Sequence, residues 1–123
     1  MFQAERNVVR VHIVEDDTAV ADALLVVLSD FGHTVECYPD GETFVGTALL
    51  TSEDVVIVDV GLPGIGGDEV IMHLNTMPES PRIIAISGKP KNALDRRLAG
   101  LPSHVLLRKP LSLSALTEHL SQA

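Results

Sequence analysis

The sequence has one cysteine, no long apolar run and few basic residues, and each shortage excludes a class of protein. Cys37 has no second cysteine with which to form an intrachain disulfide, so a disulfide-stabilised secreted scaffold is excluded. No apolar stretch approaches the roughly 20 residues of a membrane span, and the first residues lack the apolar core of a signal peptide. We therefore expect a cytoplasmic protein without a membrane partner.

The shortage of basic residues makes the chain acidic. Nine Lys and Arg residues against 17 Asp and Glu residues give a formal net charge of −8. This charge repels phosphate backbones, which argues against direct nucleic-acid binding by this chain. The acids concentrate in residues 1–81, whereas residues 82–109 hold most of the basic side chains. Because 123 residues are enough for one domain, we expect the two signs to lie on different faces of one fold.

Short β-branched runs alternate with stretches of helical spacing five times along the chain. The predicted strands cover residues 8–14, 34–38, 54–59, 82–87 and 105–108. The predicted helices cover residues 18–31, about 41–50, 68–77 and 91–99, and a last helix begins at residue 112. The first helix is expected to end at Gly32 and to carry its apolar residues on one side, namely Val20, Leu24, Leu25, Leu28 and Phe31. In the last helix, Leu113, Leu116 and Leu120 recur at helical spacing. This alternation is typical of an α/β fold, a doubly wound five-stranded parallel sheet with right-handed crossovers and helices on both faces.

Polar residues gather where four of the predicted strands end. They are Glu15, Asp16, Asp59, Ser87 and Lys109, and Gly88 adds a backbone N–H. Sites in such a sheet form beyond the carboxyl ends of the strands. Two carboxylates 4 Å apart repel by about 4 kcal/mol at an effective dielectric of 20, so this cluster needs cations. Lys109 supplies one charge, and Mg²⁺, which prefers oxygen ligands, would supply two more. Such a set suits a phosphoryl group in transfer. The nearby Asp17 is assigned to capping the helix that follows.

Four motifs at these strand ends carry a family resemblance. The stretches Ile13–Asp17, Asp59–Pro63 with Gly67 following, Ile86–Gly88 and Arg108–Pro110 together resemble the receiver domain of two-component response regulators. The resemblance covers essentially the whole chain, in the order and the spacing of the motifs. It implies the flavodoxin-like (CheY-like) strand order 2-1-3-4-5 and a single receiver domain over residues 1–123.

The resemblance implies a role for each matching acidic residue. Asp59 matches the phosphoacceptor, the nucleophile that takes a phosphoryl group from a histidine kinase or a histidine phosphotransfer protein. Asp16 matches the acid that binds Mg²⁺, Glu15 belongs to the same acidic pocket, and Gly61 would lend its backbone carbonyl to the metal.

The neutral and basic positions match as well. Ser87 matches the hydroxyl that turns toward the phosphoryl group, beside the N–H of Gly88, and Lys109 matches the lysine that pairs with it. Pro110 follows that lysine in the family through a peptide bond that is commonly cis. The resemblance thus implies a phosphoacceptor signalling domain that catalyses its own phosphotransfer and autodephosphorylation, not an enzyme with a separate substrate.

One switch position departs from the family. Three residues before the lysine the family usually carries Tyr or Phe, and this chain has Leu106. Phosphorylation would then act through Ser87 and the loop that follows it. The basic residues near the predicted helix 91–99 and the fifth strand are Lys89, Lys91, Arg96, Arg97 and Arg108. We expect an acidic output partner, or a second copy in a homodimer, to dock on this face.

The sequence is also compared with three other functions that proteins of this kind could have. A receiver-like module that binds partners without phosphorylation is favoured by Leu106 alone. A phosphohydrolase with an aspartyl nucleophile generally needs a second Asp where this chain has Gly61. A flavin-binding module is disfavoured because acids after the first strand repel a flavin phosphate.

The histidines at 12, 33, 73, 104 and 119 show no i, i+4 pair, so we expect no zinc site. They are predicted to be strand, turn and helix-surface residues. The sequence leaves open the kinase, the output, and whether the chain is a complete regulator or part of a longer protein.

Overall fold

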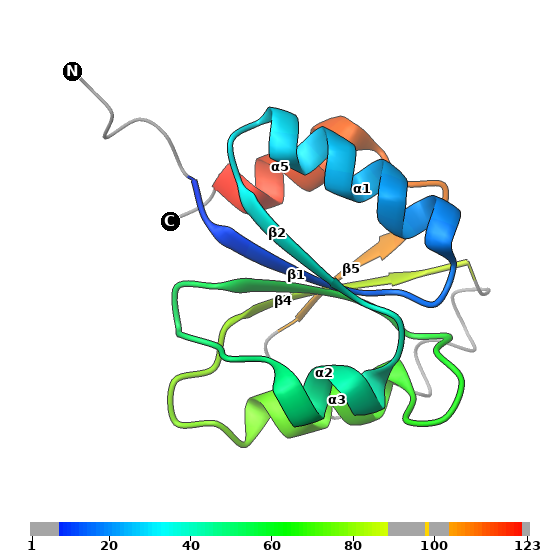
Figure 1. Cartoon of the computed structure of the whole chain (residues 1–123), viewed down its shortest axis with the longest axis vertical. Helices are drawn as coiled ribbons and strands as arrows, with labels where there is room; N and C mark the ends of the chain where they lie inside the picture. The colour runs from blue at the N-terminus through cyan, green and yellow to red at the C-terminus, as the bar shows by residue number, and fades with distance from the viewer. Residues whose placement is uncertain (1–7, 89–97, 99–103, 122–123) are drawn as a thin grey trace.

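The computed structural model describes residues 8–88, 98 and 104–121. It contains a five-stranded parallel sheet in the order β2-β1-β3-β4-β5, with helices on both faces (Figure 1). The strands are β1 (Arg10–Val14), β2 (Thr34–Tyr38), β3 (Val55–Asp59), β4 (Arg82–Ser87) and β5 (His104–Arg108). The helices are α1 (Thr18–Asp30), α2 (Gly41–Thr47), α3 (Gly67–Asn75) and α5 (Leu113–Ser121). The predicted fold class and strand order are confirmed.

The sheet separates two apolar cores because successive side chains of a strand point to opposite faces. On one face, Ile13 and Ile57 pack with Leu24 and Leu28 of α1 and with α5. On the other face, Val56 and Val58 pack with residues of α2 and α3. Figure 1 shows α1 and α5 together on one side of the sheet and α2 and α3 on the other. All five residues of β3 are buried, as expected of a central parallel strand.

Two expectations about the first helix hold and one is wrong. Asp17 caps α1, with its carboxylate accepting the N–H groups of Ala19 and Val20, and Gly32 follows the helix with φ +95°. Leu25 and Phe31, expected on the packed side, are 36% and 57% exposed. Because α1 is apolar around most of its circumference, spacing alone does not identify which apolar residues face the sheet.

Smaller differences concern the ends of elements. α2 ends at Thr47 instead of about residue 50, because Ala48 already has an extended backbone. Of the three leucines at helical spacing in the last helix, Leu116 and Leu120 are buried, whereas Leu113 is 48% exposed. The predicted helix 91–99 and the basic residues Lys89, Lys91, Arg96 and Arg97 lie outside the described residues. Among the described residues, no helix is both long enough and apolar enough to cross a membrane.

Candidate functional site

The carboxyl ends of the strands bring the predicted site residues to one edge of the sheet. Since all strand pairs are parallel, the ends of β1, β3, β4 and β5 share that edge. Glu15 follows β1, Asp59 is the last residue of β3, and Lys109 follows β5. Residues far apart in the sequence therefore meet here.

Three carboxylates converge at this edge. Glu15, Asp16 and Asp59 each offer one oxygen, and these oxygens all lie within 4.8 Å of one another. Glu15 and Asp59 are buried, with 2% and 7% of their surface exposed, whereas Asp16 is open to solvent. Three acids at this separation form the group that the sequence placed at the strand ends, and their mutual repulsion favours a bound cation.

Lys109 lies between the two buried acids. Its Nζ is 3.0 Å from Glu15 Oε1 and 3.2 Å from Asp59 Oδ2. Burial alone would lower the pKa of Lys109, but the two carboxylates outweigh burial and raise it. The lysine therefore stays charged, and one ammonium serves two carboxylates.

This single ammonium does not fully compensate Glu15. Burial, followed by the effect of the neighbouring Asp59, raises the pKa of Glu15 to about 7, although the Lys109 contact opposes the rise. Glu15 Oε2 accepts the backbone N–H of Asp17 at 3.2 Å. Oε1 is fully buried and, within the described part of the chain, accepts no hydrogen bond of good geometry besides its ion pair. The negative charge of Glu15 is thus only partly neutralised, and a second cation would stabilise it further.

Backbone groups orient the Asp59 carboxylate. The Gly61 N–H donates to Asp59 Oδ1 at 2.9 Å, while Oδ2 faces Lys109. A Cβ at Gly67 would overlap the Asp59 carbonyl oxygen and come within 2.6 Å of Val60 Cα. The first residue of α3 therefore has to be glycine for the helix to begin directly against the backbone of Asp59.

The predicted neutral residues lie at the neighbouring strand end. Ser87 is fully buried at the end of β4, and its carbonyl accepts the N–H of Lys109 at 2.8 Å. A Cβ at Gly88 would lie 4.0 Å from Lys109 Cδ, which places Gly88 beside the lysine stem. The Lys109–Pro110 peptide bond is cis, as the resemblance implies. Leu106, partly buried on β5, packs against the core under α2 and α3.

Known proteins similar to this chain identify its family. The family model for the response regulator receiver domain matches residues 11–121. The chain belongs to the response regulator receiver family. The receiver is 30% identical over 115 residues to the transcriptional regulatory protein QseB of Haemophilus influenzae, covering 90% of this chain and 50% of that protein. It is 32% identical over 114 residues to the transcriptional regulatory protein TcrA of Mycobacterium tuberculosis, covering 91% and 44%. The chain thus spans about half the length of these relatives.

Solved structures show the same fold. The crystal structure of FixJ-N has a TM-score of 0.79 and 21% identity, covering 92% of both chains. The receiver domain of Ssk1 from Saccharomyces cerevisiae, solved with the histidine phosphotransfer protein Ypd1, has a TM-score of 0.75 and 18% identity. That match covers 93% of this receiver and 87% of that chain.

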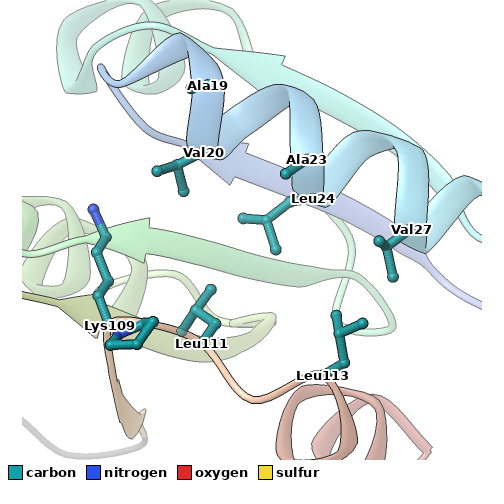
Figure 2. A pocket seen from close by; sticks show the side chains of 9 residues that line it. Ala19, Val20, Ala23, Leu24, Val27, Lys109, Leu111 and Leu113 are labelled. Carbon is teal, nitrogen blue, oxygen red and sulfur yellow. The ribbon is translucent and has the colours of Figure 1, made fainter.

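An apolar groove next to the site was not predicted from the sequence. It holds about 470 Å³ between α1 and the segment that leads into α5. Figure 2 shows Val20 and Leu24 of α1 facing Lys109 and Leu111. The other lining residues are Ala19, Ala23, Val27, Pro110 and Leu113. The apolar residues that surround most of α1 were the signal that could have found it, because more of them are present than one packed face requires.

A buried polar network was missed as well. His12, 1% exposed, lies with Nδ1 2.9 Å from the Tyr38 hydroxyl and Nε2 2.9 Å from Asp54 Oδ2. Asp54 also accepts from the Thr51 hydroxyl at 2.9 Å. The histidine was expected to be an ordinary strand residue. Its partners are 26 and 42 positions away, so no local spacing marks them.

Proposed function

We propose that this receiver takes a phosphoryl group onto Asp59 from a phosphorylated histidine of a histidine kinase or histidine phosphotransfer protein. The observation that supports it best is the buried Asp59 carboxylate, 3.2 Å from Lys109 Nζ and beside two further acids. In the reaction, an Asp59 oxygen forms a bond to phosphorus as the phosphorus–nitrogen bond breaks. The electron pair of that bond stays on the imidazole nitrogen.

Mg²⁺ fits the carboxylates that surround this acceptor. Three converging carboxylate oxygens are ligands that a hard divalent ion prefers, and the buried Glu15 is only partly compensated by Lys109. In this proposal Asp16 and Asp59 bind the ion, Glu15 contributes to the pocket, and Gly61 lends its carbonyl. When bound, the ion neutralises charge on the oxygens of the transferring phosphoryl group.

Three further residues would act on the phosphoryl group. Lys109 already contacts Asp59, so its ammonium would pair with a phosphoryl oxygen once Asp59 is phosphorylated. Ser87 would provide a hydroxyl and Gly88 a backbone N–H from the adjoining end of β4. The same groups would hold the phosphoryl group while water removes it in autodephosphorylation.

The groove beside Lys109 is proposed as the surface on which the protein donor docks. It is lined mainly by apolar residues, it includes the lysine that contacts Asp59, and two of its lining residues on α1, Ala19 and Ala23, are exposed. The similar Ssk1 receiver was solved with a histidine phosphotransfer protein, which supports a donor of that class. We place this exchange in the cytoplasm. We also propose that a second copy of the chain, forming a homodimer, or an output partner binds the face that includes β5.

A second candidate function is partner binding without phosphorylation, and Leu106 is the observation that favours it. A receiver that lacks an aromatic switch at this position has lost one means of passing on its phosphorylation state. The filled acceptor, metal and lysine positions favour phosphorylation over this alternative.

Incubation with acetyl phosphate and Mg²⁺ tests the proposal. We expect intact mass spectrometry to find one added phosphate on the native protein. The addition should be absent in Asp59→Asn and in native protein kept in EDTA. Labelling that survives Asp59→Asn would assign the acceptor elsewhere, and native protein that takes no phosphate from any donor would leave the second candidate.

A further inference from the structure

One carboxylate fastens the loop between Asp59 and α3 to the start of α2. The loop, residues 60–66, buries Val60 and Leu62 but exposes Pro63 and Gly64 at its tip. Glu42, in the first turn of α2, accepts the backbone N–H of Ile65 through Oε2 at 3.1 Å. This hydrogen bond connects the loop after the phosphoacceptor to an element 23 positions earlier in the chain.

Two glycines let α2 lie directly on this loop. A Cβ at Gly41 would lie 3.0 Å from the Ile65 carbonyl oxygen and 3.1 Å from Val70 Cγ2. Gly64 has φ +70°, and a Cβ there would overlap the Glu42 carboxylate. The carboxylate therefore lies against bare backbone at the tip of the loop, where a side chain would displace it.

The backbone that Glu42 holds is the backbone that orients Asp59. At the start of the loop, the Gly61 N–H donates to Asp59 Oδ1 at 2.9 Å. At the end of the loop, Glu69 Oε1 accepts the Gly66 N–H at 3.2 Å, which fixes the entry into α3. Glu42 supplies the contact between these two, at the exposed tip.

We propose that Glu42 is a positioning residue for the phosphoacceptor loop. By holding Ile65 it fixes the Gly61 backbone, and thereby the Asp59 carboxylate and the Gly61 carbonyl that would face Mg²⁺. Within the described part of the chain, the contacts of Glu42 are with the backbone of Ile65 and Gly64 and not with Asp59 or the other proposed metal ligands, so its effect passes through the loop backbone. This inference rests on the proposed function of Asp59.

The test compares Glu42→Ala, Glu42→Gln and a charge-matched control, Glu53→Ala. Glu53 is exposed before β3, at the opposite edge of the sheet, and its removal changes the net charge by the same amount. Two quantities are measured for each variant: the Mg²⁺ concentration at half of the maximal thermal shift, and the acetyl phosphate labelling rate at saturating Mg²⁺. Melting in EDTA reports any purely structural loss.

We expect Glu42→Ala to raise the Mg²⁺ midpoint roughly ten-fold, the low end of what losing a partner that orients metal ligands costs. Glu42→Gln should restore most of the affinity, because the amide oxygen can still accept the Ile65 N–H. Glu53→Ala should match the native protein. Equal midpoints for Glu42→Ala and Glu53→Ala would overturn the proposal, as would Glu42→Gln as weak as Glu42→Ala. Native protein that binds Mg²⁺ but takes no phosphate would instead contradict the proposed function.

Discussion

Glu15 couples the stability of the metal-free protein to pH. Its pKa rises from 4.5 to about 7, first because the carboxyl is buried and then because Asp59 lies beside it. Between these values the folded chain holds a proton that the unfolded chain has released, so this contribution to stability is lost as pH rises through 7.

Comparison with Glu15→Gln isolates this carboxyl from other titrating groups, such as His33, whose pKa is lowered by burial. In EDTA, Glu15→Gln should be more stable than the native protein at pH 8, on the order of 2 kcal/mol. At pH 4.5 the two should be nearly equal, as measured by urea unfolding. An advantage for the variant that is the same at both pH values would contradict the assigned shift.

Gly67 lies where an added side chain would meet backbone. A Cβ there meets backbone atoms of Asp59 and Val60, which cannot rotate away as the end of a side chain could. We expect Gly67→Ala to destabilise the protein by about 2 kcal/mol, within the usual range for overpacking, and to slow phosphorylation of Asp59.

Gly46 provides the matched control for this substitution. It lies within α2, and a Cβ there would have no atom within 4 Å. Gly46→Ala should therefore stabilise the protein by about 0.5–1 kcal/mol through helix propensity. Urea unfolding measures both changes, and equal effects of the two substitutions would show that the close approach at Gly67 is unimportant.

At the scale of elements, hydrogen bonds between three buried side chains connect the neighbouring strands β2, β1 and β3. Tyr38 of β2, His12 of β1 and Asp54 before β3 are hydrogen-bonded beneath Phe44 of α2, whose ring packs edge-on against Tyr38. Tyr38→Phe leaves a buried His12 nitrogen without this partner, which we expect to cost about 1–2 kcal/mol of stability. In a His12→Leu background the same substitution should cost much less, because the pair is coupled. Additive losses in a urea double-mutant cycle would contradict this coupling.

The elements themselves were largely predictable, and their faces were less so. The bounds of β2 and β4 agree with the prediction because turn residues flank short β-branched runs. Leu25 and Phe31 were assigned to the wrong surface because α1 is apolar on nearly every side. The partners of His12 were not predictable, because tertiary packing alone brings Tyr38 and Asp54 to it.

At the scale of the whole molecule, a substitution in the groove can distinguish docking of a protein donor from the phosphorylation of Asp59 itself. Ala23 lines the groove beside Lys109, whereas Ser29 is exposed farther along the same helix and does not line it. Ala23→Glu should slow transfer from a phosphorylated histidine protein at least ten-fold, because a charge enters an apolar interface. Its labelling by acetyl phosphate should equal that of Ser29→Glu, which adds the same charge. Equal transfer from the protein donor to both variants would exclude the groove as the docking surface.

The acidic site was predictable from the sequence for a reason that applies to the whole fold. Parallel strands all end at one edge, so acids and a lysine at strand ends had to meet once the strand order was known. The Glu42 contact was not predictable in this way, because it depends on how α2 packs against a loop. The groove depends likewise on how α1 and α5 share one face of the sheet.

The ion pair between Lys109 and Asp59 can form only late in synthesis of the chain. The two residues are 50 positions apart, and Lys109 follows the last strand to be synthesised. A partly synthesised chain that has folded β1 to β4 holds the acidic residues but not the ammonium that pairs with them. During translation, Asp59 therefore gains its ion pair with Lys109 only after the edge strand β5 has been made.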